Sequence, residues 1–461
     1  MKQSIKLLLG GALLLSLPMF LTSCEDILGE WSKPTPSIVT PSDGGGATTS
    51  DTYIKYSTSG TPSNEPIGNA TKWEFTATTT VPAGTYYVEG SVHCAGKLIL
   101  AGEVNLILKD GATLTVDDGI TAYDDVFTNL GGSLNIYAQS TGDSKGKLVV
   151  TNNTPVGGEA HAVIVNTITI HGGDINVTAD TNPTPCGVGA GLETIKGNLI
   201  IYDGKITAEA PGSGFMVNEG DLNIWKGTIT STSTNNGGIQ VKHTTTGGNI
   251  LIKDGTITAT SGAWMAGITA SGDMEIDGGT VTANGAKRME GIAVTSGTLT
   301  IKGGTVNANG GEGDIDSNPV GGQGIMATTV DVQGGSLTAI GGNGANGAGA
   351  QHAGGDGGPG ISGNVKVSGS ATVIATGGKG GDGKNNDNDG DGGNGGIGID
   401  GDLDNASPNV TVTGGNGGNA GYPTSGSNTG GTGAAAISGT LSGSAAPIMT
   451  NGNNGNDAAV L

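Results

Sequence analysis

Short segments in which apolar and polar residues alternate recur along most of the chain, and glycine separates them. In the segment 298–310, Leu299 and Ile301 alternate with polar residues. A glycine pair follows, after which Val306 and Ala308 resume the alternation. A period of two is typical of strands with one buried face. The pattern therefore predicts two short strands that meet at a glycine corner.

This motif is repeated, and a third alternating strand follows the loop after each copy. The turn glycines are separated by steps of 31, 23, 28, 24, 25 and 31 residues, which indicates loops of varying length attached to a fixed coil. A β-sandwich would also alternate, but its hairpins need short turns between similar strands. The clearest copies span 221–233, 249–261, 273–285, 298–310 and 329–341, and third strands include 238–241, 291–295 and 322–326.

We therefore predict an all-β fold, a single-stranded parallel β-helix with coils over residues 53–340. Stacking the coils at about 4.8 Å buries the inward Leu, Ile, Val and Ala in continuous ladders. The composition agrees, because 91 residues are Gly and only 3% are aromatic, so side-chain volume suits thin layers better than an aromatic-centred core. The strand-like segments 73–81 and 84–92 are expected to form a capping layer.

From residue 341 to 461 we expect coils that carry long glycine-rich loops and end in a C-terminal cap. Three of these loops begin with Gly-Gly and read in triplets rich in Gly, and they span 341–361, 377–397 and 414–437. A three-residue period with side chains excluded suits closely packed polyglycine-II-like helices. The alternative is a flexible low-complexity loop.

The arrangement of these loops resembles the glycine-rich layers of phage tail-tip adhesins. That resemblance implies that the loop tips carry receptor specificity. Here the tips would be 351–355, 384–391 and 422–428.

The N-terminus has the features of a secretory leader, because a positively charged start precedes an apolar run too short to span a bilayer. The Leu-Thr-Ser-Cys ending resembles the lipobox of bacterial lipoproteins, and the two acidic residues after it resemble the surface-export signal of the Bacteroides group. The resemblance implies a signal peptide at 1–23, a lipidated Cys24, a flexible tether over 24–52 and a surface-exposed position on the outer membrane. The alternative is an ordinary leader with a chance cysteine.

The charge balance excludes one class of partner. The chain has 41 acidic and 20 basic residues, a net charge of -21, and a single arginine, Arg288. Duplex nucleic acid requires clustered Lys and Arg, so it is not an expected partner. Besides Cys24 there are two cysteines, Cys94 and Cys186, and in stacked repeats two residues so far apart seldom meet. We expect them to be unpaired, although an oxidising compartment permits a disulfide.

One outward position, directly after the first strand of each copy, holds four ring side chains in succession, followed by charged residues. Equivalent positions of a β-helix line up in columns, so the rings are expected to form a flat platform on which the sugar rings of a polysaccharide or glycan stack. The alternative is that they shield the backbone of a flat sheet. The residues are Tyr137, His171, Tyr202 and Trp225, and then Lys253, Asp277 and Lys302.

Two further outward columns consist largely of threonine, as in the pairs Thr256 with Thr258 and Thr280 with Thr282. This array resembles that of ice-binding β-helices. Threonine also favours strands through its own β-propensity, which is the simpler explanation.

The middle glycine-rich tip contains a candidate calcium site. Asp387, Asp389 and Asp391 precede Gly392, as in the opening of a calcium-binding loop. Gly398 stands where such a loop requires a glutamate as its twelfth residue. The alternative is a solvated acidic turn.

The predicted fold resembles the right-handed pectin-lyase-like β-helices of pectate lyases and polygalacturonases. The likeness is one of fold, and fold does not establish function. A lyase needs calcium or another counter-charge on the uronate and a basic side chain near its α-proton. Arg288 is the one arginine of the chain, and it lies in a short loop without an acidic cluster. A hydrolase needs two acids at a set separation, whereas Asp117 and Asp118 are strand neighbours that point to opposite faces. The polygalacturonase-like NTD, GHG and RIK signatures are missing.

We therefore expect a non-catalytic surface lipoprotein, similar to carbohydrate-binding β-helix lipoproteins. It would bind a polysaccharide or host glycan, or adhere through its glycine-rich tips. A polysaccharide lyase or glycoside hydrolase of the β-helix type is one alternative. A purely structural surface stalk is another.

Overall fold

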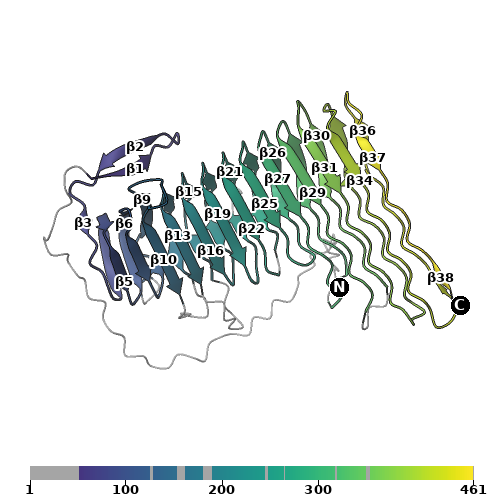
Figure 1. Ribbon diagram of the computed structural model, residues 1–461, viewed down its shortest axis with the longest axis horizontal. Coiled ribbons are helices and arrows are strands. Elements are labelled where there is room, and N and C mark those ends of the chain that lie inside the picture. Colours follow the sequence, from purple (N-terminus) through teal and green to yellow (C-terminus); the bar gives the residue numbers. More distant parts are fainter. Residues whose placement is uncertain are drawn as a thin grey trace, which may run out of the picture. The chain divides into compact units, whose positions relative to one another are not determined.

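The computed structural model describes residues 51–124, 128–152, 161–179, 189–243, 248–263, 265–316, 319–348 and 353–459. Within them the chain forms strands and turns, and it contains no helix that could cross a membrane. The strands build two long parallel sheets and two small antiparallel two-stranded sheets, and the coils follow one another in chain order (Figure 1). The predicted all-β parallel β-helix is confirmed.

One strand of each coil belongs to a 13-stranded sheet, and the other strands belong to a 21-stranded sheet. The 13-stranded sheet consists of β5 (Ser91–Cys94), β7 (Thr113–Val116), β10 (Lys147–Asn152), β13 (Asp174–Ala179), β16 (Lys205–Ala210), β19 (Thr228–Ser233), β22 (Thr256–Thr260), β25 (Thr280–Asn284), β27 (Thr305–Asn309), β29 (Ser336–Ile340), β31 (Thr372–Thr376), β34 (Val410–Thr413) and β37 (Ile448–Thr450).

The 21-stranded sheet carries two rows of short strands, which merge where one strand continues round a bend. Its strands are β3 (Thr71–Lys72), β4 (Thr79–Val88), β6 (Leu98–Leu108), β8 (Ile120–Thr121), β9 (Ser133–Ala138), β11 (Val163–Val165), β12 (Ile168–Ile170), β14 (Leu192–Thr194), β15 (Leu199–Ile201), β17 (Phe215–Asn218), β18 (Leu222–Ile224), β20 (Ile239–Lys242), β21 (Ile250–Ile252), β23 (Ile268–Ala270), β24 (Met274–Ile276), β26 (Ile292–Ile301), β28 (Ile325–Val332), β30 (Ile361–Val367), β32 (Ile399–Asp400), β33 (Leu403–Asn405) and β36 (Leu441–Ser442).

The register between coils keeps equivalent residues opposite one another. Leu222 of β18 pairs with Ile250 of β21, and Ile229 of β19 pairs with Ile257 of β22. A one-residue slip would turn every inward side chain to the solvent, so the buried face fixes this register.

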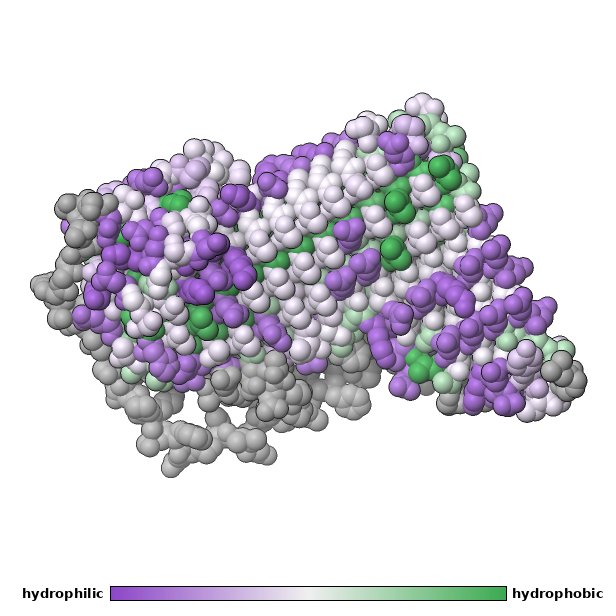
Figure 2. All heavy atoms as spheres, in the orientation of Figure 1, coloured by the Kyte–Doolittle hydropathy of each residue, from purple (hydrophilic) through white to green (hydrophobic). Residues whose placement is uncertain are grey.

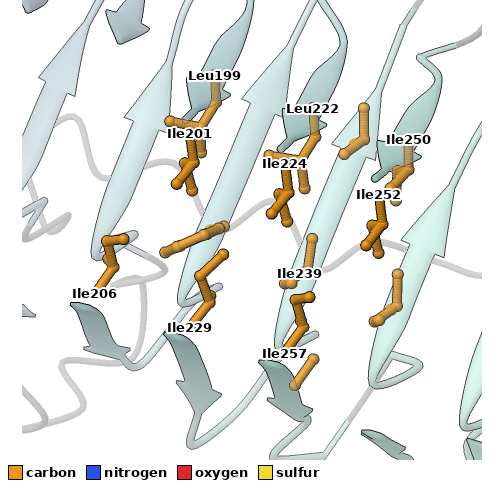
Figure 3. Packing of buried hydrophobic residues seen from close by; sticks show 14 of the residues in the cluster. Leu199, Ile201, Ile206, Leu222, Ile224, Ile229, Ile239, Ile250, Ile252 and Ile257 are labelled. Atoms are coloured by element: carbon orange, nitrogen blue, oxygen red, sulfur yellow. The ribbon is translucent and has the colours of Figure 1, made fainter. Parts of the chain in front are cut away.

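The core consists of apolar ladders that run from coil to coil. Figure 3 shows Leu199, Leu222 and Ile250 in one ladder, with the isoleucines two residues later in the next. These side chains are at most 2% exposed. Burying a side chain of this size contributes about 1.5–3 kcal/mol. Because the ladders run from coil to coil, each coil is stabilised chiefly by the coils before and after it.

The glycine corners lie where the sequence predicts them. Gly204, Gly227 and Gly255 have φ values of 124°, 118° and 110°, which L side chains rarely adopt. Space is restricted too, because a Cβ at Gly227 would lie 2.7 Å from the carbonyl oxygen of Gly204 in the preceding coil. Corner and stacking therefore both require glycine.

An aromatic cluster closes the first coil, as expected for a capping layer. Trp73 packs edge-on against Phe75 and Tyr86, with ring centroids 4.9 and 5.6 Å apart. The Trp73 indole Nε1 donates to the Phe75 carbonyl oxygen at 3.1 Å. This cluster covers the end of the apolar ladders, which would otherwise be open to water.

The glycine-rich loops are ordered by hydrogen bonds that cross from leg to leg. Each loop runs out and back, and every leg donates an N–H to the preceding leg at 2.7–2.9 Å. This network starts with the loop at 310–324, before the predicted boundary at 341. One file of donors and acceptors passes through Gly311, Gly322, Gly342, Gly358, Gly378, Gly396, Gly415, Ala434 and Gly452.

Asparagine and aspartate explain the third position of the triplets. The Asn346 side-chain oxygen accepts the N–H of Asp382, whose carboxylate accepts the N–H of Asn419, whose side chain accepts the N–H of Asn456, all at 2.8–3.0 Å. Each polar side chain thus satisfies a backbone donor in the next loop that no carbonyl reaches.

Candidate functional site

The four predicted ring residues lie in one column, which we call the ring file: Tyr137, His171, Tyr202 and Trp225. Their strands pair in register, and the rings stack face to face along the column. Ring centroids are 4.4, 5.0 and 5.9 Å apart, with interplanar angles of 8°, 17° and 28°. The spacing of the coils is close to the stacking distance of flat rings, so each ring uses its faces on its neighbours.

A hairpin covers the ring file, and we call it the strap: β1 (Thr52–Tyr56), the turn 57–61 and β2 (Pro62–Pro66). Tyr56 of β1 lies parallel to Tyr202, with centroids 5.5 Å apart. Gly60, in the turn, stands so close to the Trp225 ring that a Cβ there would overlap it. The ring side chains of Tyr137, His171 and Tyr202 are consequently only 5% exposed.

The strap is joined to the coils by a small second core. Ile67, Ala70, Tyr87, Ile107 and Tyr137 form this cluster on the outer side of the 21-stranded sheet. Tyr53 packs against it and meets the Tyr137 ring edge-on at 4.9 Å. The cluster is separate from the ladders inside the coils.

His171 accepts the one hydrogen bond from the strap backbone to a side chain of the ring file that the described residues show. The Tyr56 N–H donates to His171 Nδ1 at 2.9 Å, so Nδ1 carries no proton. Burial, with a smaller effect of Lys55, lowers the pKa of His171 from 6.5 to about 4. Burial and the neighbouring Asp203, which accepts from the Tyr56 hydroxyl at 3.3 Å, raise the pKa of Tyr56 to about 12.

The ring file therefore differs from the platform expected of it. A sugar ring stacks on an exposed aromatic face, whereas here the faces contact one another and the strap covers the outer edges. The sequence offered one signal for the strap, which is that Tyr53 and Tyr56 lie three residues apart. That separation is about 10 Å in a strand, or about two coil spacings, so the two tyrosines reach rings two coils apart.

Beyond Trp225 the column becomes ionic, as the sequence indicated. Lys253 pairs with Asp277, and Lys302 Nζ lies 2.7 Å from Glu275 and 3.5 Å from Asp277. The two lysines and the two acids alternate along and across the coils. The change from rings to charges coincides with the end of the strap, whose turn reaches Trp225 and no further.

The 13-stranded sheet presents a flat outer surface without charge, which we call the threonine face. It covers strands β19 to β34, where outward side chains alternate with fully buried ones. Figure 2 shows rows of pale, weakly polar residues across this part of the molecule. The outward residues are Thr228, Thr230, Thr232, Thr256, Thr258, Thr260, Thr280, Thr282, Asn284, Thr305, Asn307, Asn309, Ser336, Thr338, Ile340, Thr372, Ile374, Thr376, Thr411 and Thr413.

The loop tips are held by cross-loop bonds. The Asn388 side-chain oxygen accepts from the N–H groups of Thr424 and Ser425 at 3.1 and 2.8 Å. The last tip is closed by the pairing of β35 (Ser427–Asn428) with β38 (Ala458–Ala459). Tyr422 is 57% exposed at this edge. The first predicted tip lies partly outside the described residues.

Two carboxylates of the candidate calcium loop, those of Asp387 and Asp391, have protein partners. The Asp387 carboxylate accepts the N–H of Asp389 and lies 3.7 Å from Lys384 Nζ. The Asp391 carboxylate accepts both the N–H and the hydroxyl of Thr429, at 2.6 and 2.9 Å. In the described part of the chain, no three His, Cys, Asp or Glu side chains gather as metal ligands would.

The remaining sequence candidates are dispersed. The Asp117 carboxylate accepts from Nε2 of the exposed His93 ring at 2.8 Å, and Arg288 occupies a strained turn with φ 67°. Cys94 is a buried free thiol, and burial raises its pKa. Cys24 and Cys186 lie outside the described residues, so their lipidation and pairing stay predictions. Comparison of the chain with known protein families, curated proteins and solved structures finds no match.

Proposed function

We propose that the protein is a non-catalytic, surface-anchored binding protein and that it holds a neutral polysaccharide on the threonine face. One observation carries this proposal, the absence of charge from a flat, regular surface of a chain whose net charge is -21. The absence is local, because the preceding strands of the same sheet present Lys147, Asp174 and Lys205.

The chemistry of threonine suits a neutral, hydroxyl-rich ligand. A charged surface loses hydration energy when a neutral partner covers it, whereas this face carries no charge to desolvate. Each threonine offers a hydroxyl that donates and accepts hydrogen bonds beside a methyl group that contacts apolar C–H surface. Repetition from coil to coil lets an extended polymer make the same contact many times, so that weak contacts add up.

Binding to insoluble and soluble neutral polysaccharides tests the proposal. We expect the double variant Thr258→Lys with Thr282→Lys to lose binding at least tenfold. The matched control is Thr169→Lys with Thr300→Lys, which places the same charges on outward positions of the other sheet. Equal binding by both variants would remove the threonine face from consideration. Binding lost in Tyr422→Ala alone would assign recognition to the loop tips.

The surface anchor has a separate test because it rests on sequence alone. We expect Cys24→Ser to move the protein from the membrane fraction to the soluble fraction of the producing cells, since no acyl chain can then be attached. Mass spectrometry of the N-terminal peptide provides the direct readout. An unmodified N-terminal peptide in the native chain would contradict the anchor without affecting the binding surface.

A further inference from the structure

The strap is a separate element that rests on a complete coil structure. Its strands pair only with each other and join neither long sheet. The second core that attaches it shares no residue with the ladders of the main core. Removing the strap would therefore uncover the ring file but leave the coils closed.

One hydrogen bond of its attachment requires an unprotonated imidazole nitrogen. The Tyr56 N–H points at His171 Nδ1, which can accept only when it is unprotonated. A proton at Nδ1 would place two donors face to face. It would also put a positive charge near Lys55 of the strap.

Solvent can deliver that proton. A small cleft lies beside β1, and Ile54 and His171 are among the residues that line it. Its walls carry Lys145 and Asp203, and Asp203 is already shared between the Tyr56 hydroxyl and Lys226 at 3.3 Å each. The carboxylate on this wall is thus already held by a hydroxyl and an ammonium group.

We propose that the strap is an acid-released latch, which docks on the ring file while His171 is neutral and leaves it when His171 is protonated. Release would free residues 52–66, which lie between the proposed tether and the coils. At full extension this segment adds up to about 50 Å of reach. The proposal concerns the distance between coils and anchor and holds whether or not the threonine face binds polysaccharide.

The direction and size of the effect follow from linkage. The pKa of His171 is about 4 when the strap is docked and returns toward 6.5 when the strap has left. The released state thus binds more protons between these values, and docking weakens as the pH falls through this window. Between pH 7.5 and pH 5 the docking equilibrium is expected to fall about 30-fold.

Hydrogen exchange of the full chain at pH 7.5, 6 and 5, corrected for intrinsic rates, tests the latch. In the native protein the peptide covering 52–66 should lose protection as the pH falls, while peptides from β18 and β19 keep theirs. His171→Gln, whose amide oxygen accepts but does not titrate, should abolish this dependence. His93→Gln, at an exposed site in the first coils, should leave it unchanged.

Two results would overturn the latch. One is protection of 52–66 in the native chain that stays constant from pH 7.5 to 5, whatever the variants do. The other is a His171 NMR titration near 6.5 while the strap remains docked. If the strap of the His171→Gln variant does not dock at neutral pH, the native chain alone tests the latch. The loss of exchange protection over 52–66 must then follow the NMR titration of His171.

Discussion

Glycine meets two different physical demands in this chain. At the corners it provides a positive φ, as at Gly304 with φ 77°. Along the legs of the glycine-rich loops, glycines such as Gly393 lie outside that region, and the requirement is space. A Cβ at Gly393 would overlap the carbonyl oxygen of Gly355 in the preceding loop. The first demand is local to a turn, and the second depends on the neighbouring coil.

Substitution of one loop glycine should therefore disturb several loops. We expect Gly393→Ala to cost about 3 kcal/mol, because the added methyl group meets rigid backbone and not a side chain that can move. Hydrogen exchange should increase at Gly393 and at Gly418, whose N–H donates to the Gly393 carbonyl. Gly142→Ala is the control, since its Cβ would find its nearest neighbour 4.0 Å away. Equal effects of both substitutions would contradict the packing argument.

The polar ladders show how charge is placed at the residue scale. Asn198, Asp221, Asn249 and Asp273 form one such ladder, in which each side chain accepts an N–H from the next coil at 2.8–2.9 Å. Acids alternate with amides, so two carboxylates never follow each other at one coil spacing. Like charges in adjacent strands destabilise a sheet, and the alternation avoids this cost in an acidic chain.

At the scale of elements, the strap and the coils should respond independently to substitution. We expect Tyr56→Ala to expose residues 52–66 to proteolysis, because it removes the ring that lies against Tyr202. The coils should keep their melting temperature, since Tyr56 lies outside their core. Ile224→Ala serves as the contrast, because this fully buried side chain supports the ladders and its loss costs about 2–5 kcal/mol. A coil structure that melts early in Tyr56→Ala would show that the strap is part of the core.

The sequence allowed the repeating elements to be predicted but not the contact between distant ones. Alternation around Gly227 and Gly255 encodes a strand, a corner and a strand, and each is a local property. The alignment of Tyr202 with Trp225 followed from the repeat. The orientation of the rings could not be predicted from the repeat, because it depends on coil spacing. The covering of the rings by the strap could not be predicted either, because Tyr56 docks on a residue more than a hundred positions away in the sequence.

The triplet period of the loops can be tested by insertion. A Gly-Gly-Asn triplet added after both Lys379 and Asn394 lengthens the two legs of one loop and keeps glycine at every crowded position. We expect this variant to retain exchange protection over 377–397. A single glycine added after Lys379 should remove it, because Asp382 then takes the place of Gly383, where a Cβ would overlap the Gly390 carbonyl. Protection that survives the single insertion would mean that the legs can slip.

At the scale of the whole stack, each coil contacts chiefly the coils before and after it. The strands of the 13-stranded sheet follow one another in sequence order, from β5 to β37. In such an array stability is the sum of coil and interface contributions, and a defect acts mainly on its neighbours. A protein built in this way has no single centre whose loss unfolds everything.

Two matched core substitutions can establish how far a defect spreads. Leu114 in β7 and Leu337 in β29 are both fully buried inward residues of the same sheet, near opposite ends of it. Truncation of either to Ala removes the same atoms and should cost about 2–5 kcal/mol locally. We expect Leu337→Ala to lower exchange protection in β27, β29 and β31 and to leave β5 and β10 unchanged, while Leu114→Ala does the reverse. Because each variant controls for the other, a uniform loss of protection in both would show that the stack unfolds as one cooperative unit and that coil contacts reach beyond nearest neighbours.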